Sequence, residues 1–140
     1  MKSLMPIRAF FIIACLYDGI LGMAFLAAGP SLFAAFAVEP PNHWGYVQFP
    51  ALLLVVFAIM FAVIAADPRG QRNLIPYGIF LKLSYIAVVS GHWLSTGVPA
   101  MWKPFVVADG LFAVLLLWAY LVLGKAMQAS DAATNKQHAT

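Results

Sequence analysis

Uninterrupted apolar blocks account for most of the chain. Four of them cover residues 8–28, 47–66, 74–94 and 104–123, and short polar stretches separate them. A block of about 20 apolar residues is long enough to cross the hydrocarbon core of a bilayer as an α-helix. None of the blocks shows the alternation of a half-buried strand or the one-sided pattern of a soluble helix. The pattern predicts an all-α integral membrane four-helix bundle that occupies residues 1–124.

The connection between the first two spans is longer than a simple turn. Gly29-Pro30 ends or kinks the first helix, the apolar run SLFAAFAV is too short to span, and EPPN then interrupts the chain again. We expect a short interfacial helix here, with Pro30 in its first turn, as a lid at the outer side of the bundle. The aromatic residues expected at the same interface are Trp44, Tyr46, Trp93 and Trp102.

Two further segments are polar. The segment AADPRGQRN joins the second and third spans, and its Asp67-Pro68 and Gly70 are typical of a tight turn. Residues 125–140, KAMQASDAATNKQHAT, are small and polar and lack apolar periodicity. We expect this tail to be disordered in the cytoplasm.

Composition and charge agree with a membrane protein. Hydrophobic residues make up 64% of the chain and charged residues 9%, whereas about 25% charged residues is usual in soluble domains. We therefore expect the lipid bilayer as the main partner, and no nucleic acid, because the net charge of +3 sits at the helix ends. One side carries Lys2, Arg8, Arg69, Arg72, Lys125 and Lys136, and the other only Lys103. The positive-inside rule then places both termini in the cytoplasm.

Removal of the first span by a signal peptidase is the alternative to retention. The stretch Ile12–Cys15 fits a lipobox, and Leu26-Ala27-Ala28 resembles a signal-peptidase site. Asp18, however, interrupts the apolar region that such a signal needs, and the block continues to membrane-spanning length. We expect the span to be retained. Cys15 is the only cysteine, so the sequence contains no disulfide framework and no cysteine-based metal motif.

Three ionisable residues lie inside the spans: Asp18, Lys82 and Asp109. Each would cost about 3 kcal/mol at the bilayer centre if it faced lipid, so each should point inward and find a partner. At about 1.5 Å per residue, Asp18 and Lys82 lie roughly 15 Å and 12 Å from the cytoplasmic side, which predicts that they pair. Asp109, roughly 8 Å below the outer boundary, is expected nearer His92 and Ser90, with Tyr85 or water linking it to the pair.

Helical periodicity places other residues beside these charges. In the third span, Gly78, Lys82, Tyr85, Val89 and His92 form one stripe that should face the interior, and in the first span Asp18 shares a face with Ala14, Gly22 and Phe25, with Tyr17 beside it. Ala58, Ala62 and Ala66 form a small-residue stripe suited to close helix packing or to a homo-oligomer interface. The candidate ligand-binding or proton-relay residues are Asp18, Lys82, Tyr85, His92, Asp109 and Tyr17.

These residues leave several functions open. The first is a polar pocket, open toward the outer leaflet, for a small lipophilic ligand, or a role as accessory subunit of a membrane complex. The second is an oligomeric proton-linked transporter or channel. The third is a structural subunit in which the Asp18–Lys82 pair only fixes helix register. The sequence does not indicate an enzyme or a metal site, because it contains no phosphate loop, metal-binding helix motif or nucleophile elbow. The spacing of His43 and His92 does not require haem.

The layout resembles the DoxX-like group of small bacterial four-helix membrane proteins. The resemblance rests on the glycine-rich end of the first span, GILGMAFLAAGP, on the short apolar element after it and on the three further spans. The segment KLSYIAVVSGHWLSTGVPAMWKPFVVADGLF is also similar to that of uncharacterised bacterial membrane proteins. The resemblance implies a bacterial inner membrane location, and a quinone-linked or respiratory accessory role as in some members. A quinone or a lipid is therefore a candidate ligand, although no cofactor-binding motif accompanies the segment.

Overall fold

The computed structural model describes residues 4–138, and four α-helices make up most of them. The described part contains no β-strand. The elements in order are α1 (Met5–Ala35), α2 (Gly45–Ala66), the 3-10 turn η1 (Arg72–Leu74), α3 (Ile75–Ser95), the 3-10 turn η2 (Ala100–Trp102) and α4 (Lys103–His138). All four helices are long and apolar enough to cross a membrane. The structure thus confirms the predicted all-α bundle of four membrane-spanning helices.

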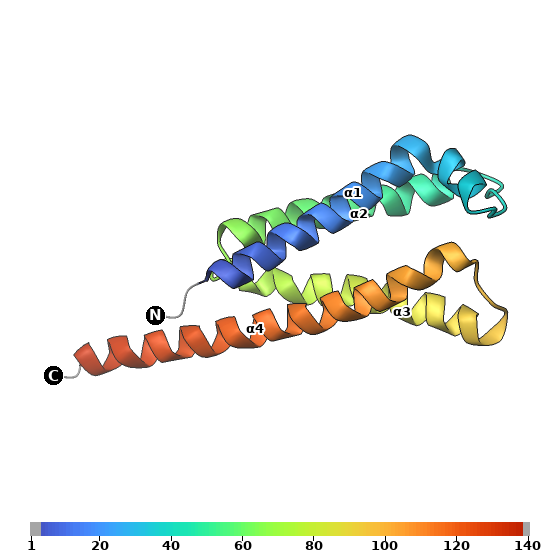
Figure 1. Cartoon of the computed structure of the whole chain (residues 1–140). Coiled ribbons are helices and arrows are strands. Elements are labelled where there is room, and N and C mark those ends of the chain that lie inside the picture. The colour runs from blue at the N-terminus through green and yellow to red at the C-terminus, as the bar shows by residue number, and fades with distance from the viewer. Residues whose placement is uncertain (1–3, 139–140) are drawn as a thin grey trace.

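The helices form two hairpins, α1 with α2 and α3 with α4, and both ends of the chain lie at the same end of the molecule (Figure 1). Small residues bring α1 and α2 together. A Cβ added at Gly22 would lie 2.6 Å from the carbonyl oxygen of Ala51, and one at Gly19 would lie 3.4 Å from Ala58 Cβ. Of the predicted alanine stripe only Ala58 is buried, while the other two alanines are exposed. The close approach therefore uses Ala51 and Ala58 against glycines of α1.

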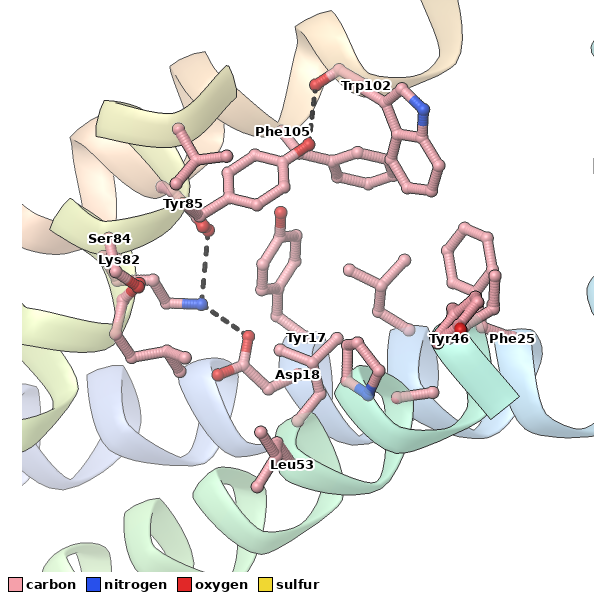
Figure 2. Close-up of a pocket in the computed structure, with 18 residues that line it drawn as sticks. Tyr17, Asp18, Phe25, Tyr46, Leu53, Lys82, Ser84, Tyr85, Trp102 and Phe105 are labelled. Atoms are coloured by element: carbon pink, nitrogen blue, oxygen red, sulfur yellow. Dashed lines mark hydrogen bonds and ion pairs between the residues drawn. The ribbon is translucent and has the colours of Figure 1, made fainter. Parts of the chain in front are cut away.

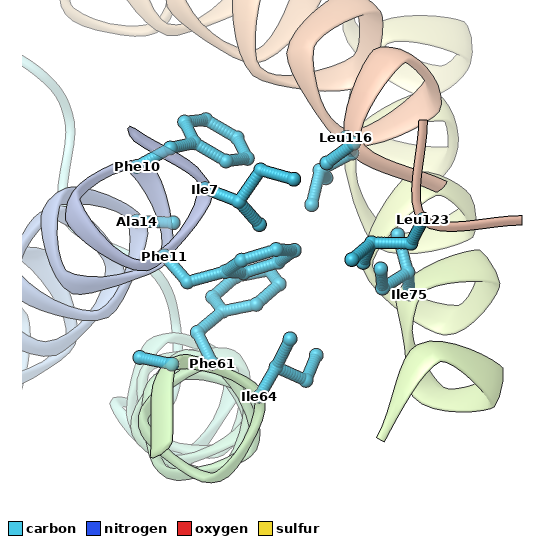
Figure 3. Packing of buried hydrophobic residues seen from close by; sticks show 11 residues of the cluster. Ile7, Phe10, Phe11, Ala14, Phe61, Ile64, Ile75, Leu116 and Leu123 are labelled. Atoms are coloured by element: carbon cyan, nitrogen blue, oxygen red, sulfur yellow. The ribbon is translucent and has the colours of Figure 1, made fainter. Parts of the chain in front are cut away.

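One apolar cluster holds the two hairpins together near the chain termini (Figure 3). We call it the inner core; its buried residues are Ile7, Phe10, Phe11, Ala14, Phe61, Ile64, Ala65, Ile75, Leu116, Ala119 and Leu123. Arg72 joins η1 to α4 at this end of the bundle. Its Nε donates to the carbonyl oxygen of Tyr120 at 2.9 Å, and its guanidinium lies 3.7 Å from the centre of the Tyr120 ring. Arg8 donates to the carbonyl oxygen of Ala66 at 3.2 Å. We refer to this end as the basic end.

The predicted interfacial helix is present as the end of α1 and not as a separate element. The backbone of Ala28 leaves the helical region (φ −132°, ψ 21°), and the helix then resumes through Pro30 to Ala35. A proline ring removes one backbone hydrogen bond and crowds the preceding turn, which explains a kink at this point. Ala37, in the left-handed region with φ 51°, follows the end of the helix.

An aromatic cap occupies the end opposite the basic end. Its four rings are Phe25, Phe33, Trp44 and Trp102, from α1, the segment before α2, and η2. The Phe25 and Trp102 rings stack with centroids 5.6 Å apart, and the Phe33 ring meets Trp44 and Trp102 edge-on at 5.3 and 6.0 Å. The cap therefore ties the α1–α2 connection to the start of α4.

The structure differs from the expected disordered tail, because α4 continues to His138. Residues 125–138 contain four alanines and neither glycine nor proline. Alanine has the highest intrinsic helix propensity, and extending an existing helix avoids the cost of nucleation. Low apolar periodicity therefore did not imply a break in the helix.

Candidate functional site

Three charged side chains meet in the middle of the bundle, and we call them the ion cluster: Asp18 of α1, Lys82 of α3 and Asp109 of α4. Lys82 Nζ lies 2.5 Å from Asp18 Oδ1 and 3.2 Å from Asp109 Oδ1. The exposed fractions of Asp18, Lys82 and Asp109 are 0%, 1% and 7%. The contact between Lys82 and Asp18 appears in Figure 2. The ion pair predicted from helix depth is therefore confirmed.

The predicted position of Asp109 was wrong. It contacts Lys82 directly and needs neither Tyr85 nor water as a link. In η2 the Trp102 carbonyl oxygen accepts a hydrogen bond from the Tyr85 hydroxyl at 2.9 Å (Figure 2). Asp109 follows seven residues later, about two helical turns along α4. Helix depth locates backbone positions only, whereas the flexible Lys82 side chain reaches the carboxylates of both Asp18 and Asp109.

Two aromatic rings lie beside the ammonium group of Lys82. Its Nζ is 5.0 Å from the centre of the Tyr17 ring and 5.4 Å from that of Phe112, and these two rings are 4.8 Å apart. Ring faces attract cations, so they add to the stabilisation of the lysine charge. Phe112 was not among the predicted site residues. Its place three residues after Asp109, on the same face of the helix, was the available signal.

A cavity of about 460 Å³ lies next to the ion cluster, and residues from all four helices line it. Its polar residues are Tyr17, Asp18, Lys82, Ser84, Tyr85, Asp109 and Tyr46, and the others are apolar or aromatic. Lining residues from α2 and α3 are exposed, namely Leu53 (39%), Tyr46 (70%) and Val88 (61%). Because Asp18 and Phe25 on α1 and Asp109 on α4 are buried, the cavity opens sideways between α2 and α3.

Two buried polar atoms at the cavity have no hydrogen-bond partner among the described residues. They are the Tyr17 hydroxyl and Asp18 Oδ2. The Tyr17 ring stands between Asp18 and Tyr85, with its hydroxyl directed away from Asp18 (Figure 2). Buried polar groups in proteins are usually paired, so each such atom calls for an explanation. Both atoms belong to residues that line the cavity.

The cavity brings together five of the six predicted site residues and leaves out His92. His92 is exposed in the last turn of α3, where its carbonyl oxygen accepts from the backbone N–H groups of Thr96 and Gly97. The predicted stripe on α3 is buried at Gly78 and Lys82 only. His43 is exposed as well, and its Nδ1 accepts from the Gly45 N–H at 3.0 Å. The two histidines therefore take no part in the cavity.

Apolar packing closes the bundle on both sides of this site along its axis. The inner core fills the basic end, and the aromatic cap fills the opposite end. The arrangement is thus a buried polar centre at the bottom of an apolar cavity that opens sideways. Comparison of the chain with known protein families, with curated proteins and with solved structures found no match.

Proposed function

We propose that this small membrane protein binds a lipophilic molecule in the cavity between its two hairpins. The polar head of the molecule lies at Tyr17 and the ion cluster, and its apolar part lies among the side chains of α2 and α3. The observation that carries the proposal is the pair of buried, unpartnered polar atoms beside an otherwise largely apolar cavity. Cavities of 300–1,000 Å³, mostly apolar with a few convergent polar groups, are typical of small-molecule sites.

The direction of the opening indicates where the ligand comes from. The opening between α2 and α3 lies at the depth of membrane-spanning residues such as Leu53 and Val88. A molecule dissolved in the bilayer reaches such an opening without crossing water. The proposed ligand is therefore a lipid or another membrane-soluble molecule.

Proton-linked transport, the second function considered, requires a polar path through the bundle. In the described part of the chain, the inner core separates the ion cluster from the basic end with fully buried residues such as Phe11, Phe61 and Leu116. This packing favours a binding site over a conduction path. Membership of the DoxX-like group, a role as accessory subunit and oligomer formation stay predictions.

We further propose that the protein lies in a bacterial inner membrane with both termini in the cytoplasm. Support comes from Arg8, Arg69, Arg72 and Lys125, which belong to the basic end, whereas Lys103 begins α4 at the opposite end. Cytoplasmic segments carry the excess of basic residues. Lys2, which contributed to the sequence prediction, lies outside the described residues.

Fluorescence quenching of Trp102, which lines the cavity, tests ligand binding. The variant W44F/W93F/W118F keeps Trp102 as the single tryptophan. In phosphatidylcholine vesicles, a fatty alcohol brominated along its chain should quench this fluorescence and reach saturation. Probe molecules in the bulk bilayer would instead quench in proportion to their concentration.

A pair of matched variants in the same background locates the binding. L54F/V88F places larger side chains in the cavity wall, and L52F/V56F makes the same changes on the outer face of α2. The first should abolish the saturable part of the quenching, and the second should retain it. Quenching that is linear with probe, and equal in the two variants, would contradict the proposed function.

A further inference from the structure

The charges at the cavity do not balance. The ion cluster contains two carboxylates and one ammonium group, all almost fully buried. Of the other described basic residues, Arg8 and Arg72 are bound at the basic end and Lys103 lies over the Trp93 ring at 4.9 Å. A buried charge without a counter-charge is costly. The surplus negative charge is balanced either by a proton on one carboxyl group or by one positive charge from outside the chain.

The hydrogen-bonding groups at the cavity favour a donor as the ligand head. Asp18 Oδ2 is an acceptor without a partner, and the Tyr17 hydroxyl can also accept. Three donors of the lining are in use, because Tyr85 donates to the Trp102 carbonyl, Ser84 donates to the Leu81 carbonyl and the Lys82 ammonium faces both carboxylates. A head that only accepts hydrogen bonds would find as unused donors, among the described residues, the Tyr17 and Tyr46 hydroxyls and the Trp102 indole N–H.

Aromatic rings around the cavity also favour a positively charged ligand head. The lining includes the rings of Tyr17, Phe25, Tyr85, Trp102 and Phe105. The face of an aromatic ring carries partial negative charge and attracts ammonium groups, most strongly where water is excluded. Carboxylates and ring faces together disfavour an anionic head.

From these three features we propose that the ligand is a lipophilic primary amine, bound as its ammonium ion. The ammonium group donates to Asp18 Oδ2, and the hydrocarbon chain extends past Leu21 and Leu54 toward the opening between α2 and α3. This inference rests on the proposed function and specifies the chemical class of its ligand.

Three probes that differ only in their head group test the inference. They are a dodecyl amine, alcohol and carboxylate, each brominated along the chain, measured by Trp102 quenching in W44F/W93F/W118F in phosphatidylcholine vesicles. Concentrations are expressed as mole fraction in the bilayer, so that differences in partitioning cancel. The amine should bind at least about tenfold more tightly than the alcohol, since a charge-assisted hydrogen bond is worth 1.4 kcal/mol or more. The carboxylate should bind most weakly.

Variants then locate the preference. D18N removes one negative charge from the cluster and should abolish the preference, so that in this variant the amine binds no more tightly than the alcohol. E39Q removes the same charge from an exposed residue outside the cavity and should keep the preference. If D18N no longer binds the alcohol, D109N takes its place with the same expectation.

The outcomes separate this inference from the proposed function. Saturable binding of all three probes without a preference for the amine would overturn the inference and leave the proposed function standing. Absence of saturable binding for every probe would contradict the proposed function itself. A preference for the amine that persists in both D18N and D109N would also overturn the inference, since it would not arise from the cluster.

Discussion

Replacement of Lys82 by methionine should destabilise the bundle strongly. Methionine has a similar length and lacks the charge, so the substitution removes the ammonium group and changes packing little. Asp18 and Asp109 would then face each other without a cation, and both are buried. Their contacts with Lys82 Nζ, at 2.5 and 3.2 Å, would both be lost.

The expected loss in the free energy of unfolding is about 3–5 kcal/mol, the range found when one partner is removed from a buried ion pair. Unfolding by sodium dodecyl sulfate in mixed micelles, followed by tryptophan fluorescence, measures this quantity. Lys103→Met is the matched control, because this lysine lies at the end of the bundle, and its described contact is with the Trp93 ring. We expect a loss below about 1 kcal/mol for it.

A triple variant separates lost charge balance from lost packing. K82M/D18N/D109N leaves no charge in the cluster and keeps side chains of similar volume. It should recover more than half of the stability lost in K82M, since neutral amides carry a much smaller cost of burial than carboxylates. If K82M is no less stable than K103M, the two carboxyl groups are solvated or protonated in the variant, and the expected cost of an unbalanced buried charge is refuted.

Three further substitutions test the fold. Gly22→Ala should separate α1 from α2 and cost about 1–3 kcal/mol, because its Cβ would lie 2.6 Å from a backbone oxygen. The control Gly110→Ala lies inside α4 and meets nothing within 4 Å, so in the same unfolding assay it should be neutral or stabilise by up to about 1 kcal/mol. Arg72→Gln removes the bond to the Tyr120 carbonyl and should cost about 1–3 kcal/mol; unchanged unfolding would contradict this. Ala129→Pro should reduce the helical circular dichroism of the C-terminal segment without changing bundle unfolding, and an unaltered spectrum would contradict a helix there.

The sequence predicted the spans and the first ion pair for the same physical reason. Backbone groups in lipid must be paired within the segment, so an apolar block of this length has to be helical, and its rise per residue is fixed. Depth then follows from counting residues, and Asp18 and Lys82 were found at matching depth. Counting failed for Asp109, because it locates backbone positions only, whereas the flexible Lys82 side chain reaches both carboxylates. The direction that such a side chain takes leaves no periodic trace in the sequence.

The cavity was predicted as a polar pocket open toward the outer leaflet, but the two helices that flank its opening were not predicted. Intramembrane charges indicated a polar centre, and the segment after Pro30 indicated a lid. The lateral opening depends on how the two hairpins lie relative to each other, which is set by packing in the inner core and by Gly78 of α3, where an added Cβ would lie 2.7 Å from the Phe61 ring of α2. Helical periodicity identifies the inward face of each helix, but it does not give the spacing between hairpins.

The ion cluster has a structural and a ligand-binding interpretation, and each depends on a different carboxylate oxygen of Asp18. Its Oδ1 contacts Lys82 and joins α1 to α3, which is all that fixing helix register requires. Its Oδ2 is buried without a partner among the described residues, and Asp18 is one of the residues that line the cavity. If the cluster had a structural role alone, the folded protein would be more stable with that oxygen hydrogen-bonded or replaced by an apolar group. The triple variant K82M/D18N/D109N therefore distinguishes the two: stability should largely return, whereas the preference for an amine over an alcohol should not, because no carboxylate remains to accept the ammonium group.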